Sequence, residues 1–246
     1  MTKCNFTFIT ALLICLIFAD KVNANENLNL SSINFVANEA LVEQQIAEII
    51  LKQVYANINV AANVIPMPPS RASSMNLNLE SDGEIARIYS YGVKFPQLIR
   101  VEPPYYSLTT TGFCLKEKNI EIKTKADLTK YSLAVIRGVA HTDAASEGHP
   151  NVMAIATGVQ LYDLVLKGRA DIALDSGING RKFLAKKEYS GLKECGTIAN
   201  LELYNYLNVK SAKYQKPVSE ALTKLKSSGE LKKMIQKAEN EVLSKN

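Results

Sequence analysis

Asp175 occupies a position at which a carboxylate could bind a ligand. It follows the apolar residues 172–174, which are typical of a buried strand, and it precedes the turn residues Ser176 and Gly177. Ligands of α/β proteins bind beyond the carboxyl ends of strands, so a carboxylate at this point could pair with a cationic group. The alternative is a structural role, because aspartate also caps turns of this kind. The sequence leaves both interpretations open.

Arg87 could bind the opposite, anionic end of a ligand. It ends the segment D-G-E-I-A-R (82–87), and its planar guanidinium can hold a carboxylate through two hydrogen bonds, which a lysine cannot. The alternative is a salt bridge with a neighbouring acid, Glu84 or Glu102. Arg71, just after a double proline, is a second candidate, although an arginine in this context is commonly a solvated helix residue.

Gly138 lies in a turn between a predicted strand and a predicted helix, where backbone N–H groups could face an anion. A residue without a side chain lets these groups approach a ligand, and Thr142 adds a hydroxyl group. The alternative is an ordinary turn glycine. The segment is not a P-loop, because the required G-K-[ST] is absent.

Patterns of enzyme and metal chemistry are sparse in this sequence. His141 and His149 are the only 2 histidines, and the chain has no G-x-S-x-G motif and no C-x-x-C metal pattern. We therefore expect no cofactor, no metal site and no catalytic residue. His141 could hydrogen-bond a ligand or lie exposed at the start of a helix.

The N-terminus has the pattern of a cleaved secretory signal. Lys3 precedes an uncharged apolar run at residues 6–19, and residues 22–24 (V-N-A) precede a cleavage site. The run is shorter than the roughly 20 residues that span a bilayer. We predict a signal peptide at 1–24, cleavage after Ala24 and secretion into the periplasm.

Cys114 and Cys195 remain after this cleavage. In an oxidising compartment they could form one disulfide or stay as two buried thiols. The sequence cannot supply the short Cα distance that a bridge requires, so both states are open.

The distribution of charge argues against one class of partner. The net charge of +5 comes from scattered basic residues, without an arginine-rich stripe interleaved with aromatic residues. We therefore expect no nucleic-acid binding.

Strands alternate with helices along the rest of the chain. Strands are predicted at residues 31–37, 59–65, 132–138, 152–156 and 170–175, and helices at 41–54, 71–77, 158–168 and 217–245, the last with a break at Gly229. This order is typical of parallel α/β sheets flanked by helices. The segments 79–87 and 165–174 each place a glycine turn and an aspartate before an Ile-Ala strand, which suggests two similar lobes.

Three segments together resemble the family 3 extracellular solute-binding proteins, the periplasmic partners of amino-acid ABC transporters. They are, in order, "YSLAVIRGVAHTDAA", "GVQLYDLVLKGRADIALDSG" and "LYNYLNVKSAKYQKPVSEALTKLKSSGELKKMI". The order and spacing match over roughly residues 59–240.

The resemblance implies a two-lobed periplasmic-binding-protein fold, each lobe a mostly parallel sheet flanked by helices. The first lobe would comprise residues 25–112 and 199–246, the second 118–198, and two crossover strands near 112–118 and 198–207 would form the hinge. Ligand would be held between the lobes by hinge closure. Asp175 would take the position of the carboxylate that pairs with a ligand ammonium group, and Cys114 and Cys195 would lie near neighbouring hinge segments.

Two departures from the family pattern make the ligand less predictable than the fold. The chain lacks the aromatic-Pro-Pro-aromatic loop near its start and the Ser-x-Thr-x-x-Arg segment whose arginine binds a ligand carboxylate. The D-G-E-x-x-R segment at 82–87 instead resembles an orphan branch of this family, in which the ligand is less predictable.

The expected function is periplasmic capture of a small polar solute, an amino acid or related organic anion, by a monomer that delivers it to an inner-membrane ABC permease. Ligand contacts are expected from five residues: Asp175, Arg87, Gly138, Thr142 and Arg71. One alternative is an enzyme on the same scaffold, a dehydratase or lyase with a cleft carboxylate as general acid, because a fold alone does not exclude catalysis. Another alternative is a periplasmic sensor protein.

Overall fold

The computed structural model describes residues 31–39 and 41–244, so the predicted signal peptide and the cleavage site after Ala24 lie outside the described residues. Within this part of the chain, a sheet of 8 strands has the order β2-β1-β3-β8-β4-β7-β5-β6. The strands are β1 (Ser31–Asn38), β2 (Val60–Met67), β3 (Gly83–Ile88), β4 (Ile99–Leu115), β5 (Leu133–Ile136), β6 (Val152–Ile155), β7 (Ile172–Ser176) and β8 (Leu192–Leu207).

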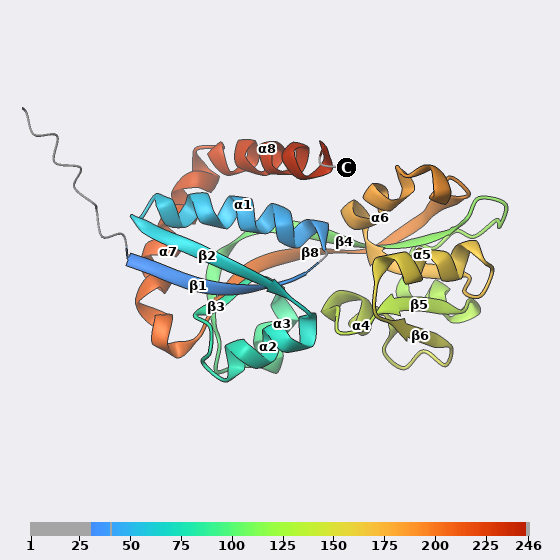
Figure 1. Cartoon of the computed structure of the whole chain (residues 1–246), viewed down its shortest axis with the longest axis horizontal. Coiled ribbons are helices and arrows are strands. Elements are labelled where there is room, and N and C mark those ends of the chain that lie inside the picture. Colours follow the sequence, from blue (N-terminus) through green and yellow to red (C-terminus); the bar gives the residue numbers. More distant parts are fainter. Residues whose placement is uncertain (1–30, 40, 245–246) are drawn as a thin grey trace, which may run out of the picture.

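Helices cover both faces of this sheet (Figure 1). The α-helices are α1 (Val42–Ala56), α2 (Pro69–Leu77), α3 (Tyr89–Lys94), α4 (Ala140–Ser146), α5 (Gly158–Leu166), α6 (Gly177–Leu184), α7 (Gln215–Ser227) and α8 (Glu230–Ser244). Short 3-10 helices lie at η1 (Lys125–Lys130), η2 (Lys187–Tyr189) and η3 (Val209–Tyr214).

The long strands β4 and β8 connect two lobes (Figure 1). They pair antiparallel from Ile99 opposite Leu207 to Leu115 opposite Leu192. In the first lobe β1 pairs in parallel with β2 and β3, and in the second lobe β5 pairs in parallel with β6 and β7. The structure confirms the predicted fold class, which is two α/β lobes with mostly parallel sheets joined by two crossover strands.

The predicted lobe boundaries remain a proposal. The pairing of β4 is compatible with a passage between lobes near residue 112, because the second-lobe strand β7 pairs with β4 from Thr110 to Phe113.

Each lobe has its own hydrophobic core. In the first lobe, Ile46, Ile50 and Val54 recur every fourth residue on α1 and are fully buried in one cluster with residues of β1 and β3. Burying a side chain of this kind contributes about 1.5–3 kcal/mol. In the second lobe, Leu161 and Val165 of α5 are buried in a separate cluster. The periodicity that predicts these helices therefore also identifies their buried faces.

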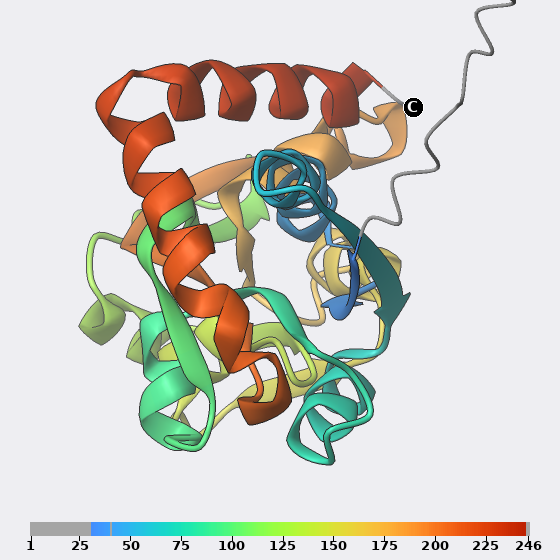
Figure 2. The same cartoon turned by 90° about the vertical axis from the view of Figure 1, so that its left-hand side faces the viewer.

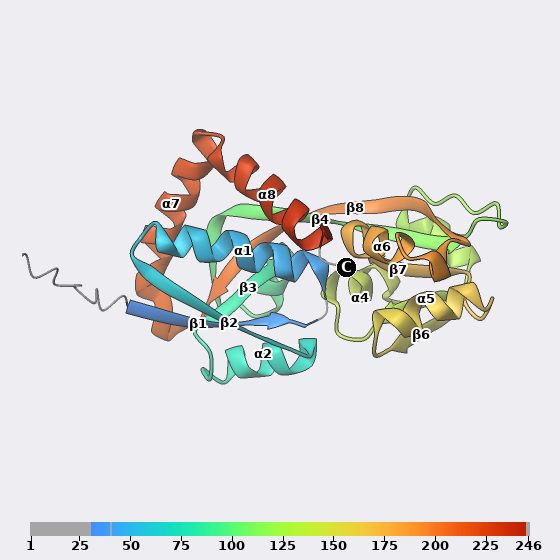
Figure 3. The same ribbon diagram turned by 45° about the horizontal axis from the view of Figure 1, so that its top comes forward.

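The two C-terminal helices complete the first lobe. The chain turns between α7 and α8 at Gly229, where a φ of +76° is favourable for glycine, and this confirms the predicted break. Figure 2 shows α8 crossing above α1, with which it is in contact. Figure 3 shows the C-terminal end of α8 approaching α6 of the second lobe.

A disulfide joins Cys114 of β4 to Cys195 of β8, with Cα atoms 6.0 Å apart. The sequence left a disulfide and two free thiols as alternatives, and the structure has the disulfide. The loop-entropy model assigns about 4.5 kcal/mol to a cross-link that closes a loop with a sequence separation of 81. The disulfide therefore links the two crossover strands, β4 and β8, covalently at their second-lobe ends.

Among the described helices, none combines the length and the apolar character that crossing a membrane requires.

Candidate ligand-binding cleft

The two lobes meet around two adjoining hollows. An outer hollow of about 660 Å³ lies between α2 and α3 of the first lobe and α4 of the second. An inner hollow of about 30 Å³ lies between the start of α1 and β3 on one side and the start of α4 on the other. Arg87 and Ala140 line both hollows. A molecule that occupies the outer hollow could therefore extend into the inner one.

The lobes are in direct contact beside the inner hollow. Leu41 of the first lobe packs in the hydrophobic cluster of the second, and Ile178 of the second packs in the cluster of the first. The hydroxyl group of Ser176 on the second lobe donates a hydrogen bond to Glu43 Oε2 of α1 at 2.8 Å. The structure therefore has the lobes closed against each other at this point.

Charged side chains from both lobes and aromatic side chains from the first lobe line the outer hollow. Lys94 belongs to the first-lobe wall, and Asp143 and Glu147 belong to the second-lobe wall. Burial raises the pKa of Asp143, and the charge of Lys94 opposes this shift, so the two groups interact across the hollow. Tyr91 and Phe95 add aromatic rings. This lining suits a polar solute that carries charge.

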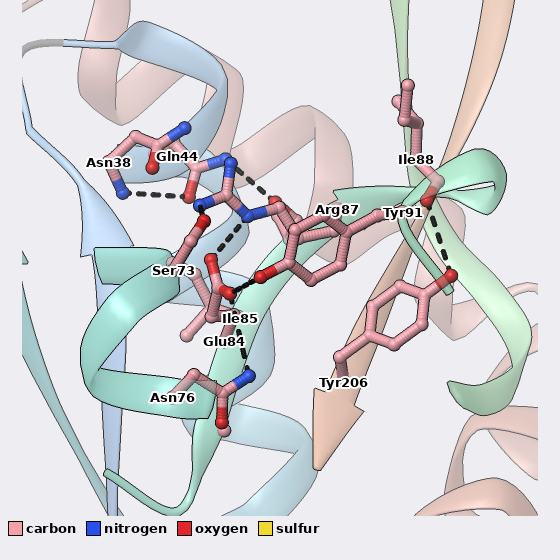
Figure 4. A network of polar contacts seen from close by, with 12 residues as sticks. Asn38, Gln44, Ser73, Asn76, Glu84, Ile85, Arg87, Ile88, Tyr91 and Tyr206 are labelled. Carbon is pink, nitrogen blue, oxygen red and sulfur yellow. Dashed lines mark hydrogen bonds and ion pairs between the residues drawn. The ribbon is translucent and has the colours of Figure 1, made fainter. Parts of the chain in front are cut away.

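Arg87 takes part in a buried polar network on the first-lobe wall (Figure 4). Its Nε forms an ion pair with Glu84, its Nη2 donates to Ser73 Oγ at 3.0 Å, and its guanidinium carbon lies 4.9 Å from the centroid of the Tyr91 ring. Glu84 also accepts hydrogen bonds from the Tyr91 hydroxyl and, at 3.5 Å, from Asn76 Nδ2. Of the two acids considered as partners for Arg87, the structure has Glu84.

This ion pair limits what Arg87 can offer a ligand. Its bonds to Glu84 and Ser73 use two of the five N–H donors of a guanidinium, and its positive charge is compensated by Glu84. Glu102, the other acid considered, pairs instead with Arg100 at 2.6 Å. A ligand contact by Arg87 stays a prediction, supported by its place in the lining of both hollows.

Asp175 lies at the end of β7 among three hydrogen-bond donors. Its carboxylate accepts from the Tyr162 hydroxyl at 2.8 Å, from the backbone N–H of Ser176 at 2.7 Å and from Asn179 Nδ2 at 2.5 Å. Burial raises the pKa of Asp175 to about 6, and the three hydrogen bonds oppose that shift. Asp175 lines neither hollow. Its role as the partner of a ligand cation stays a prediction.

The remaining predicted site residues lie in different surroundings. Gly138 lines the outer hollow and has a φ of +78°, which favours glycine in this turn. Thr142 is buried, and its hydroxyl donates to the carbonyl of Val139 at 3.0 Å. Arg71 lies exposed on α2. Thr142 and Arg71 line neither hollow, so the structure brings together Arg87 and Gly138 but not the other predicted residues.

Glu43 borders the inner hollow and was not among the predicted site residues. It has an exposed fraction of 1 %, and its pKa is raised to about 7, first by burial and then by the charge of Asp175. The two carboxylates come from opposite lobes and lie on either side of Ser176, to which both are hydrogen-bonded. One signal was present in the sequence. Glu43 precedes Ala47, Ile50 and Val54 at helical spacing, so it interrupts the apolar face of α1.

Asn38 and His141 also line the inner hollow, and each keeps one polar atom without a partner. Asn38 Oδ1 and His141 Nε2 are buried and form no hydrogen bond. The other ring nitrogen of His141, Nδ1, lies 2.9 Å from Thr110 Oγ1. Burial lowers the pKa of His141 to about 4, so its imidazole is neutral at neutral pH. Most buried polar atoms in proteins are hydrogen-bonded, so two exceptions in one small hollow are notable.

Comparison with known proteins gives a fold but no activity for this chain. No known family model matches it. A curated relative from Shewanella oneidensis is 27% identical in an alignment of 258 positions that covers 97% of this chain and 97% of the relative, and it is itself described as an uncharacterized protein.

Solved structures give a clearer likeness. A mutant of ArgBP from T. maritima has a TM-score of 0.68 at 15% identity, covering 84% of this chain and 94% of that chain. An amino acid ABC transporter substrate-binding protein from Streptococcus pneumoniae, bound to L-arginine, has a TM-score of 0.68 at 14% identity, covering 87% and 97%. A histidine kinase sensor domain with similarity to periplasmic binding proteins has a TM-score of 0.70 at 15% identity, covering 84% and 95%.

The chain has the fold of a two-lobed periplasmic binding protein. At these identities the likeness concerns the fold alone, and none of these three structures is described as an enzyme.

Proposed function

We propose that this protein captures a small polar solute, an amino acid or a related compound, between its two lobes and delivers it to an ABC-type transporter. The observation that carries the proposal is the outer hollow of about 660 Å³, which charged residues of both lobes line. This volume falls in the range of about 300–1,000 Å³ that is usual for small-molecule sites.

Lobe closure would couple capture to a change of shape. Lys94 belongs to one lobe and Asp143 and Glu147 to the other, so a charged solute can contact both lobes only when they are closed. A ligand shifts a conformational equilibrium by its difference in affinity for the two states. Bound solute would therefore stabilise the closed form, which a membrane permease could recognise.

We further propose that the protein acts in the periplasm, as a monomer, after removal of residues 1–24. The support is the pattern of Lys3, the apolar run at 6–19 and the small residues at 22–24. Mass spectrometry of the secreted protein should give an N-terminus at Asn25. An intact N-terminus, or a lipid on Cys15, would contradict this expectation.

A thermal-shift screen of the secreted protein against amino acids, polyamines, organic acids and sugars tests the proposed capture. At least one solute should raise the melting temperature, and solution scattering with that solute should show a smaller radius of gyration. Lys94→Met should weaken binding of an anionic or zwitterionic solute, whereas Lys52→Met should not, because Lys52 pairs with Glu48 on the surface of α1. If no solute stabilises the protein, solute capture is refuted.

A sensor is the second candidate, because one structure of the same fold is a histidine kinase sensor domain. Both candidates bind solute without converting it, so mass spectrometry should recover the solute unchanged. Loss of solute on incubation would instead favour the enzyme alternative. Co-purification with a permease would favour transport, and co-purification with a membrane-bound kinase would favour sensing.

A further inference from the structure

Glu43 is a buried carboxylate without a cationic partner. Its carboxylate accepts hydrogen bonds from neutral donors, the hydroxyl of Ser176 and its own backbone N–H. Within residues 31–39 and 41–244 no lysine, arginine or histidine forms an ion pair with it. Arg87 lines the same hollow, but its charge is compensated by Glu84. Buried charges in proteins are normally paired, so Glu43 lacks the cationic partner that a buried carboxylate usually has.

Asn38 and His141 provide two further groups at the same hollow. Asn38 is 6 % exposed and His141 is 5 % exposed, and each has a buried polar atom without a partner. The amide oxygen of Asn38 is an acceptor. His141 becomes an acceptor at Nε2 when its proton lies on Nδ1 and is donated to Thr110 Oγ1, 2.9 Å away. The three groups come from α1, β1 and α4, and therefore from both lobes.

We propose that the inner hollow binds the primary ammonium group of the captured solute through Glu43, Asn38 Oδ1 and His141 Nε2. An ammonium group has one positive charge and three N–H donors, which match one carboxylate and two neutral acceptors. The volume of about 30 Å³ admits a group of the size of a water molecule. The remainder of the solute would lie in the outer hollow, which shares Arg87 and Ala140 with the inner one.

The proposal rests on the proposed function and narrows the class of solute to primary amines, with or without a carboxylate. It places the ammonium group at Glu43 of the first lobe, on the other side of Ser176 from Asp175. The pKa of Glu43, raised to about 7 by burial and by Asp175, is consistent with a carboxylate that gains a cation only when ligand is bound.

Paired probes test the chemical class. Standard amino acids, putrescine and n-butylamine are each compared by thermal shift with derivatives in which every primary amine is acetylated, and the tightest pair is then measured by calorimetry. The amine should bind at least about 30-fold more tightly than its N-acetyl derivative, because acetylation removes the charge and two of the donors. If an N-acetyl derivative or a neutral sugar binds as tightly as the best amine, the ammonium site is refuted while solute capture stands. If nothing binds, solute capture itself fails.

Substitutions test the residues. Glu43→Gln keeps the shape and an acceptor for Ser176, and it should weaken binding of the best amine by about 30-fold or more. Glu48→Gln is the matched control, because Glu48 lies on the same helix and pairs with Lys52. It should leave the affinity unchanged.

Asn38→Leu provides a second variant that removes an acceptor without a change of charge. It should weaken binding of the amine by about tenfold, with little effect on the N-acetyl derivative. Melting temperatures of the unliganded variants show whether they are folded. If folded Glu43→Gln and Asn38→Leu proteins bind the amine as the unmodified protein does, the ammonium site is refuted.

Discussion

Glu84 and Glu43 are two buried carboxylates of the first lobe, and both have an exposed fraction of 1 %. Glu84 has an ion pair with Arg87 and hydrogen bonds from Tyr91 and Asn76. Glu43 has only neutral donors, the hydroxyl of Ser176 from the other lobe and its own backbone N–H. The difference indicates two roles for a buried acid. Glu84 belongs to a buried network that holds Arg87 in the wall of the cleft, whereas we propose that Glu43 binds a cation that is not part of the chain.

Removal of Arg87 should have the largest effect on stability. Arg87→Met leaves Glu84 buried without its cation, and breaking a buried ion pair costs about 3–5 kcal/mol. The free energy of unfolding, measured with urea, should fall by that amount. Arg181→Met is the control, because the Arg181–Glu194 pair is exposed at both ends and such pairs contribute about 0–1 kcal/mol. Equal losses in the two variants would mean that Glu84 does not depend on Arg87.

Glu43→Gln should have the next largest effect, and the effect should depend on pH. The pKa of Glu43 is about 7 in the folded protein and 4.5 without the fold, so the folded state holds a proton that the unfolded state has lost. Stability of the unmodified protein therefore falls as pH rises from about 4.5 to about 7. A shift of this size corresponds to on the order of 3 kcal/mol. The variant should be more stable than the unmodified protein by about this amount at pH 8 and equal to it near pH 4.5.

Other groups near Glu43 titrate in the same range but remain in both proteins. Asp175, with a pKa raised to about 6 by burial, changes stability in the same direction as Glu43. His141, with a pKa lowered to about 4 by burial, acts in the opposite direction, since its stability contribution is lost as pH falls from 6.5 towards 4. Tyr106 and Tyr162 stay neutral because burial raises their pKa. The difference between variant and unmodified protein therefore reports the titration of Glu43 together with its electrostatic interaction with Asp175. A difference that does not change with pH would contradict the buried charge.

Asp175→Asn distinguishes the two candidate ammonium sites. The amide nitrogen of the new side chain cannot accept a hydrogen bond, so one of the donors around Asp175 loses its acceptor. A buried donor left unpaired costs about 1–3 kcal/mol, which unfolding with urea should detect. The affinity for the best amine should change little. If affinity instead falls by about 2–5 kcal/mol while stability is kept, the ammonium group binds at Asp175, as the sequence-based hypothesis expects.

The fold could be predicted because its determinants are local. The spacing of apolar residues on α1 and α5 and the glycine at 229 identify helices and their ends without knowledge of the tertiary structure. The positions of Arg87 and Gly138 in the cleft also followed from short segments next to predicted strands.

The inner hollow could not be predicted because it depends on long-range packing. His141 of the second lobe lies across the hollow from Glu43 and Asn38 of the first, and periodicity does not tell which helix face turns towards the other lobe. The partner of Arg87 was left open for a similar reason. Two acids were near in sequence, and only the structure places Glu84 against the guanidinium while Glu102 pairs with Arg100.

Asn38→Leu should have the smallest effect on stability. It directly tests the comparison between the surroundings of Glu43 and those of Glu84. Asn38 Oδ1 is buried without a partner, so replacing the amide by an apolar side chain of similar size should raise the free energy of unfolding by about 1 kcal/mol. Asn76→Leu is the matched change in the other region. Asn76 Oδ1 is likewise buried without a partner, but Asn76 Nδ2 donates to Glu84, so loss of that donor should lower stability by a similar amount. Urea unfolding of the unliganded proteins at pH 7 compares the two. If Asn38→Leu is as destabilising as Asn76→Leu, the amide of Asn38 has a partner in the unliganded protein, such as a buried water molecule. Its oxygen would then not be free to bind an ammonium group, and the contrast between the two regions would fail at that residue.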